Sequence, residues 1–199
     1  MTGNRFRFLG IVAFLLVLAD QASKRWVVRH FENVEGRSEE IIPGVFDLVL
    51  TRNPGAAWGL LGDLKPDGLR IAVFVLISIG AVGMVVWLAR RAKPEQLLLI
   101  GALSLVLGGA LGNLIDRVLA GKVIDFLDFY TRADWMVERW KCGHSSGCHW
   151  PAFNVADICI STGVFLLIVE AFVSGRDERA HAGPPAPARP ADSQPTEPL

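Results

Sequence analysis

The sequence has no net charge and few charged residues for its length. Lys and Arg number 20, Asp and Glu also number 20, and together they make up only 20% of the 199 residues. A protein that binds nucleic acid concentrates basic residues against the phosphates, so the composition argues against a nucleic-acid partner. Hydrophobic residues reach 51%, and the mean hydropathy is +0.37. This balance favours a membrane protein of one domain over an ordinary soluble protein.

Four apolar stretches are long enough to cross a bilayer. They cover residues 8–28, 71–89, 97–115 and 155–173. About 20 helical residues, at roughly 1.5 Å each, span a hydrocarbon core of roughly 30 Å. The second and third stretches are joined by the short basic segment 90–96, whereas the other two connections are long. We therefore predict an all-α membrane protein with four transmembrane helices.

The two ends of the chain need separate interpretation. Arg5 and Arg7, followed by an apolar run and the small residue Ala19, are also typical of a cleavable secretory signal. Apolar residues resume at positions 26–28, as in a continuing helix, so we favour a retained first span. Residues 175–199 are rich in proline, alanine and charge and cannot bury much apolar surface. We expect residues 1–174 to form one membrane domain and residues 175–199 to be a disordered tail.

The topology brings the polar residues of the spans to one membrane face. With four crossings, the end of the first helix, the end of the third and the start of the fourth lie on the same side, together with both long loops. Asn113, Asp116 and Arg117 are spaced i, i+3 and i+4, so they share one helix face. The polar residues expected at this face are Asp20, Asn53, Asn113, Asp116, Arg117, Asp125, Asn154 and Asp157.

Asp20 is the most informative member of this group because of its depth. It lies about 18 Å along the helix from Phe8, within the outer part of the hydrocarbon region. An ionisable group at this depth is costly unless it is paired or faces a polar cavity. We therefore expect Asp20 to meet Lys24, one turn on, or groups from the third and fourth helices.

Each polar residue also has a structural explanation when it is taken alone. Asn154 with Asp157 resembles a helix N-cap followed by an acid in the first turn. The other structural explanations are a helix-end ion pair for Asp116 with Arg117, solvated loop acids for Asp125 and Asp128, and a turn before Pro54 for Asn53. Their common depth in the membrane favours a joint site over this set of separate explanations.

Five short motifs carry a resemblance to a known family. They are Asp20 in the first helix, "NPGAAWG" from Asn53, "GNLIDR" from Gly112, "VIDF" from Val123 and "FNVAD" from Phe153. In this order and at these topological positions, over roughly residues 8–173, the sequence resembles lipoprotein signal peptidase, also called signal peptidase II. The resemblance implies a four-helix aspartic peptidase that removes the signal peptide of prolipoproteins just before a lipid-modified cysteine.

The resemblance also implies roles for individual residues. Asp125 and Asp157 would be the catalytic pair, sharing a proton to activate water without a metal or another cofactor. The substrate-binding or supporting residues would be Asp20, Asn53, Asn113, Asp116, Arg117 and Asn154. Residues 41–62 would form short strands and a glycine turn, a small β-rich extracytoplasmic region between the first two helices. The partners would be prolipoproteins and membrane lipids, and we expect a monomer.

The resemblance decides the orientation, which the residues alone leave open. Basic residues occur around both faces, although three of the four positions 90–93 are basic and short loops weigh most in the positive-inside rule. The family places both termini in the cytoplasm and the active site at the extracytoplasmic face of the bacterial cytoplasmic (inner) membrane.

The segment 131–151 departs from the family pattern. Asp125 and Asp157 are 32 positions apart, and the long connection contains "RWKCGHSSGCHWP". Its Cys142, His144, Cys148 and His149 match no common zinc spacing closely. In an oxidising extracytoplasmic compartment, a disulfide between Cys142 and Cys148 is favoured over zinc. Cys159, in the fourth helix, is expected to be a buried thiol without a role.

Two other function classes fit parts of the sequence. An ion- or proton-coupled transporter would also place carboxylates in a helical bundle, but it needs a polar path to the opposite face. The spans offer few polar residues toward that side: Ser78, Ser104, Ser161, Thr162 and Glu170. An assembly protein would use the glycines of the third helix for packing and would not need a carboxylate cluster. The peptidase is therefore the favoured function.

Overall fold

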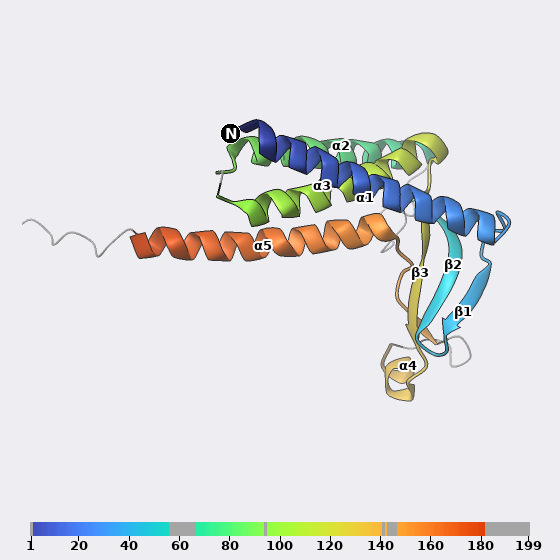
Figure 1. Ribbon diagram of the computed structural model, residues 1–199. Coiled ribbons are helices and arrows are strands. Elements are labelled where there is room, and N and C mark those ends of the chain that lie inside the picture. Colours follow the sequence, from blue (N-terminus) through green and yellow to red (C-terminus); the bar gives the residue numbers. More distant parts are fainter. Residues whose placement is uncertain (1, 56–66, 94, 141, 143–146, 182–199) are drawn as a thin grey trace, which may run out of the picture.

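The computed structural model describes residues 2–55, 67–93, 95–140, 142 and 147–181. Four long helices dominate it: α1 (Thr2–His30), α2 (Asp67–Arg91), α3 (Leu97–Ala120) and α5 (Val155–His181). Four strands and one short helix complete the described part: β1 (Ser38–Ile42), β2 (Phe46–Asn53), β3 (Val123–Thr131), β4 (Cys148–His149) and α4 (Asp134–Trp140). Figure 1 shows the long helices side by side, with the sheet leaving one end of the bundle.

The four predicted membrane spans are confirmed, with longer helices than the hydropathy indicated. In each of the four long helices the segment that could cross a membrane is at least 20 residues long. Large apolar side chains remain exposed on their outer faces, as expected of surfaces in contact with lipid. The last helix continues to His181, so residues 175–181, expected in the tail, are helical. The rest of the expected tail, 182–199, lies outside the described residues.

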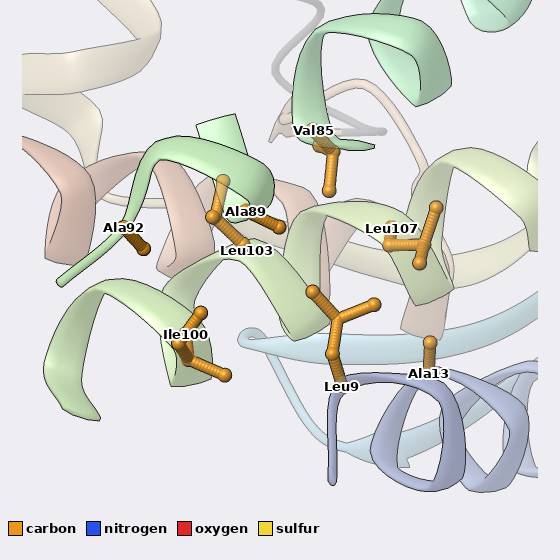
Figure 2. Close-up of a cluster of buried hydrophobic side chains, with 8 residues drawn as sticks. All are labelled: Leu9, Ala13, Val85, Ala89, Ala92, Ile100, Leu103 and Leu107. Atoms are coloured by element: carbon orange, nitrogen blue, oxygen red, sulfur yellow. The ribbon is translucent and has the colours of Figure 1, made fainter. Parts of the chain in front are cut away.

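The helix α3 is the centre of the bundle and packs against α1, α2 and α5. The core of the bundle contains eight buried apolar residues (Figure 2): Leu9, Ala13, Val85, Ala89, Ala92, Ile100, Leu103 and Leu107. Glycines let the neighbouring helices approach α3 closely. A Cβ atom on Gly109 would lie 2.4 Å from the backbone oxygen of Ala156, and one on Gly112 would lie 2.6 Å from Oδ2 of Asp20. The backbone of α3 thus lies directly against the beginning of α5 and the acidic residue of α1.

The sheet has the strand order β1-β2-β3-β4, and all of its neighbouring strands are antiparallel. The sequence prediction placed the β-rich region between the first two helices only, and this was incomplete, because β3 and β4 come from the connection between α3 and α5. In the register of β2 with β3, Asn53 pairs with Val123 and Thr51 pairs with Asp125. Within the expected segment 41–62, positions 56–62 lie outside the described residues.

A second apolar cluster fixes the sheet to the end of the bundle. Val27 of α1 and Phe31, which directly follows α1, pack against Leu48 and Leu50 of β2 and Phe126 of β3. Leu48 and Leu50 are two positions apart on β2, so they lie on the same face of the sheet, and this face is turned to the end of α1. The strand residues next to this cluster, including Asp125, are thereby held close to the polar ends of α1, α3 and α5.

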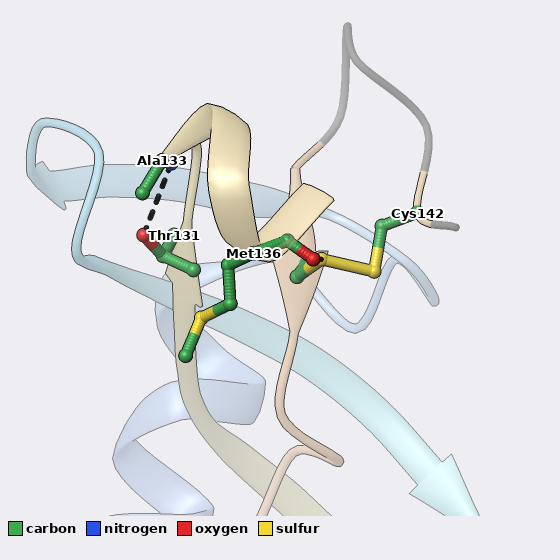
Figure 3. The surroundings of a disulfide bond; sticks show 5 residues. Thr131, Ala133, Met136 and Cys142 are labelled. Carbon is green, nitrogen blue, oxygen red and sulfur yellow. Dashed lines mark hydrogen bonds between the residues drawn. A yellow bond between two sulfur atoms is a disulfide. The ribbon is translucent and has the colours of Figure 1, made fainter. Parts of the chain in front are cut away.

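The insert 131–151 contains α4 and a disulfide between Cys142 and Cys148 (Figure 3). The disulfide ties the chain after α4 to β4, which pairs with the far end of β3. It confirms the pairing that we favoured over zinc for these two cysteines. His144, one of the two histidines of the zinc alternative, lies outside the described residues. Cys159 is a buried free thiol, as expected.

Candidate active site

Asp125 lies on β3, immediately beyond the bundle, and only 3% of its surface is exposed. Both carboxylate oxygens accept hydrogen bonds from amides of other segments. The Nδ2 of Asn154 donates to Oδ1 over 2.7 Å, and the Nδ2 of Asn53 donates to Oδ2 over 3.0 Å. Asn53 is itself oriented by the backbone N–H of Gly55, which donates to its Oδ1 over 2.8 Å. Two amides thus fix the Asp125 carboxyl from opposite sides.

Asp157 lies in the first turn of α5 and forms a reciprocal cap with Asn154. The backbone N–H of Asp157 donates to Oδ1 of Asn154 over 3.1 Å, and the backbone N–H of Asn154 donates to Oδ2 of Asp157 over 3.2 Å. The other oxygen, Oδ1, accepts a hydrogen bond of 2.8 Å from Nδ2 of Asn113 on α3. The helix-cap explanation of this pair is therefore correct as local geometry. It does not account for the Asn154 amide that reaches Asp125.

A buried ionic cluster lies beneath the two carboxyl groups. The Nζ of Lys24, which is 1% exposed, lies 2.8 Å from Oδ2 of Asp20 and 2.8 Å from Oδ2 of Asp116. The Nε2 of Gln21 donates to Oδ1 of Asp116 over 2.8 Å. Lys24 also donates to Oδ1 of Asn113 over 3.1 Å, which connects this cluster to Asp157. Asp20 therefore has the pairing that its depth in the membrane requires.

The carboxylates of this cluster also hold backbone groups of the site. Oδ1 of Asp20 accepts a hydrogen bond of 2.9 Å from the backbone N–H of Ala156, one of the N–H groups left without a partner at the start of α5. Oδ2 of Asp116 accepts one of 3.3 Å from the N–H of Ile124, on the strand that carries Asp125. The cluster thus fixes the two segments that carry Asp125 and Asp157.

A cavity of about 510 Å³ opens beside the two carboxyl groups. Its lining comes from β2, β3, α3, the segment before α5 and the first two turns of α5: Asn53, Asn113, Arg117, Val123, Asp125, Trp150, Pro151, Ala152, Phe153, Asp157, Ile158, Ser161 and Thr162. The guanidinium of Arg117 lies 5.1 Å from the ring centre of Phe74 on α2. Arg117 thus faces the cavity, and the ion pair of Asp116 is made with Lys24.

The environment of Asp125 changes its acidity. Burial is the larger cause and the negative charge of Asp157 the second, and together they raise the pKa of Asp125 from its ordinary value of 3.8 to about 7. The hydrogen bonds from Asn53 and Asn154 act in the opposite direction. Asp125 therefore holds a proton over much of the range below neutral pH, while Asp157 lies near enough to influence it.

The structure brings all eight predicted site residues to one end of the bundle. Sequence reasoning missed Gln21, which lies beside Asp20 in an apolar helix, and it named Lys24 only as a possible partner of Asp20. It also missed the stretch 150–152, which carries no charge and becomes part of the site only because it runs along β3. Asp128, outside the cavity, lies 2.8 Å from Nδ1 of His149. Within the described residues, no group of three or more His, Cys, Asp or Glu side chains is arranged to hold a metal.

These features define a multi-pass membrane protein with two neighbouring carboxyl groups in a polar cavity at one end of a four-helix bundle. Residues 12–173 match the family model described as signal peptidase (SPase) II. The chain therefore belongs to the signal peptidase II family and is a membrane peptidase.

Curated relatives and a solved structure agree with this family. A lipoprotein signal peptidase of Syntrophotalea carbinolica is 42% identical over 82% of this chain and 91% of its own. One of Shewanella pealeana is 40% identical over 86% of this chain and 90% of its own. A solved bacterial membrane enzyme superposes with a TM-score of 0.66 at 30% identity, covering 85% of this chain and 90% of the other. The similarity thus extends over nearly the full length of these proteins, and nothing in it supports the transporter alternative.

Proposed function

We propose that this protein is an aspartic endopeptidase that removes the signal peptide of prolipoproteins just before the diacylglyceryl-modified cysteine, with Asp125 and Asp157 as the catalytic pair. The observation that carries the proposal is that these two carboxyl groups line one cavity and that the pKa of Asp125 is raised to about 7. A peptidase of this class needs one protonated and one ionised carboxyl group at the same pH.

The charges of the surrounding groups favour one protonated and one ionised carboxyl group in this pair. In the part of the chain that the structure describes, the basic groups near Asp20, Asp116, Asp125 and Asp157 are Lys24 and Arg117. Four ionised carboxylates would leave an excess negative charge in a buried region, which is costly. Protonation of Asp125 reduces this excess. Asp157 then remains as the base, and its carboxylate accepts the backbone N–H of Asn154 at the start of α5, where a negative charge is favoured.

The reaction follows from these protonation states. The Asp157 carboxylate removes a proton from a water molecule, and the resulting hydroxide attacks the carbonyl carbon of the scissile peptide bond. Asp125 gives its proton to the carbonyl oxygen, which yields a neutral tetrahedral diol. When the C–N bond breaks, the amine nitrogen takes the proton held by Asp157 and Asp125 recovers a proton from the diol. Both carboxyl groups thereby return to their starting states.

The remaining predicted residues would position this pair. Asn53 and Asn154 hold Asp125, and Asn113 with Asn154 holds Asp157. Arg117, whose guanidinium lines the cavity and is fixed against Phe74, is suited to bind a backbone carbonyl of the substrate. Asp20 and Asp116 position the pair indirectly, because their carboxylates accept hydrogen bonds from backbone N–H groups of α5 and β3.

The position of the disulfide supports an extracytoplasmic site. Cys142 and Cys148 lie in the connection between α3 and α5, at the same end of the bundle as the cavity. Disulfides persist in oxidising compartments outside the cytoplasm. The opposite end carries the short basic connection between α2 and α3, which the positive-inside rule assigns to the cytoplasm. Both termini would then be cytoplasmic, in the bacterial inner membrane, with membrane lipids around a monomer.

The test is cleavage of a diacylglyceryl-modified prolipoprotein by the purified protein, with identification of the new N-terminus. Wild-type protein should release a product that begins with the lipid-modified cysteine, without added metal or cofactor. Asp157→Asn should fold and lose turnover, because the amide keeps the shape of the side chain and can accept one of its two hydrogen bonds but cannot act as a base. Asp128→Asn, on the same strand as Asp125 but outside the cavity, is the matched control and should cleave normally. Appreciable turnover by Asp157→Asn would contradict the catalytic assignment.

A further inference from the structure

A second cavity, of about 410 Å³, lies between the far end of β3, α4 and β4. Its walls are mostly aromatic or apolar: Phe129, Tyr130, Thr131, Met136, Trp140, Cys142, Cys148, His149, Trp150 and Pro151. Among the described residues, the lining contains no carboxylate and no Lys or Arg. Its one titratable imidazole, His149, is stacked on Tyr130 and lies 2.8 Å from Asp128. Such a cavity suits an apolar ligand without charged groups.

This apolar cavity adjoins the candidate active site. Trp150 and Pro151 line both cavities. The stretch that contains them runs antiparallel to β3: the N–H of Trp150 donates to the carbonyl oxygen of Phe129 over 2.7 Å, and Phe153 forms a bridge with Leu127. Residues 150 and 151 of a single extended segment therefore lie between the two cavities.

The separation of the two cavities is small. Asp125 and Phe129 are four residues apart on β3, which corresponds to about 13 Å along a strand. A ligand attached to the residue next to the scissile bond needs to reach only this distance. A long acyl chain is long enough, whereas a short one is not.

We infer that the apolar cavity binds one acyl chain of the substrate's diacylglyceryl group. This inference rests on the proposed function, which places the lipid-modified cysteine beside Asp125 and Asp157. A peptide segment would leave backbone groups without partners in this cavity, whereas methylene groups require none. Because the chain is covalently attached to a residue held in the active site, its binding there is effectively intramolecular and is favoured by a high local concentration.

The insert builds the outer wall of this cavity. Trp140 of α4 and Trp150 before α5 are 72% and 58% exposed, so two large aromatic surfaces of the lining remain accessible. The disulfide joins Cys142, just after α4, to β4, and both cysteines belong to the lining (Figure 3). The cross-link thus holds α4 in place as a wall against β3 and β4.

The test compares cleavage of two substrates that differ only in the length of their acyl chains. One prolipoprotein carries palmitoyl chains and the other carries hexanoyl chains, both presented in the same detergent micelles. Trp140→Ala removes one aromatic wall and should raise KM for the palmitoyl substrate roughly tenfold with kcat unchanged. Its KM for the hexanoyl substrate should not change, and Trp140→Phe should restore most of the preference for the longer chain.

Trp135→Ala is the matched control, because Trp135 is an exposed tryptophan on α4 that does not line the cavity. It should cleave both substrates like the wild-type protein. An equal effect of Trp135→Ala and Trp140→Ala would overturn the inference in favour of a general contact of α4 with lipid, and an unchanged chain-length preference in Trp140→Ala would overturn it outright. Failure of the wild-type protein to cleave either substrate would instead refute the proposed function, and the inference with it.

Discussion

Replacing Asp125 by asparagine should strongly reduce the rate of cleavage and at the same time stabilise the protein above neutral pH. The carboxyl group is buried, and its pKa is about 7 in the folded protein against an ordinary value of 3.8. This difference corresponds to roughly 4 kcal/mol in favour of the neutral form. A carboxyl group with a raised pKa contributes stability below pH 4, and this contribution is lost as the pH rises through 7. At pH 8 the wild-type protein must bury the ionised group, whereas the asparagine variant does not.

The hydrogen bonds of the site offset part of this gain. Asn53 and Asn154 each direct an amide N–H at one oxygen of Asp125. An asparagine at this position offers one oxygen and one NH₂ group, so one of these donors loses its acceptor, at a cost of about 1–3 kcal/mol. The net change at pH 8 should be a stabilisation of the order of 1–3 kcal/mol. At pH 5 the wild-type carboxyl is neutral, so the variant should be equally stable or less stable.

The catalytic rate of the asparagine variant should fall, although its stability at pH 8 should rise. The asparagine can neither donate nor recover the proton that we propose Asp125 transfers, and loss of such a general acid lowers kcat by about 10²–10⁴-fold. In the wild-type protein, kcat/KM should fall above about pH 7 as Asp125 loses its proton. The assay combines prolipoprotein cleavage with thermal unfolding of both proteins in the same detergent at pH 5 and pH 8. Retained turnover, or a loss of activity accompanied by a lower melting temperature at pH 8, would refute the reasoning.

Three further predictions concern the groups that hold the site together. Lys24→Met leaves two buried carboxylates without their counter-charge and should destabilise the fold by about 3–5 kcal/mol, measured by thermal unfolding; an unchanged melting temperature would contradict the ion pairing. Gly112→Ala places a methyl group 2.6 Å from the carboxylate of Asp20 and should cost about 1–3 kcal/mol of stability by the same measurement, and a neutral effect would show that the helices can separate. In protein purified without reductant, alkylation should label neither Cys142 nor Cys148 until the disulfide is reduced; labelling of both beforehand would rule out the cross-link and remove one support for the extracytoplasmic site.

The sequence by itself determined the four spans and the end of the bundle at which the polar residues meet. Each span is visible because a membrane requires a run of about 20 apolar residues, which is a local property of the chain. Once the number of crossings is known, Asp20, Asn113 and Asp157 must lie near the same membrane face. The five motifs identified the family because their order and topological positions are also properties of the linear sequence.

Only the tertiary structure decided how these residues interact. The approach of α1 to α3 places Lys24 between Asp20 and Asp116, and the crossing of α3 and α5 at Gly109 brings Asn113 to Asp157. The pairing of strands from two different loops could not be predicted from local patterns, because it depends on contacts between residues 70 or more positions apart. For the same reason the raised pKa of Asp125 could not be foreseen, since its burial and the nearby charge of Asp157 exist only after β3 has packed onto the end of the bundle.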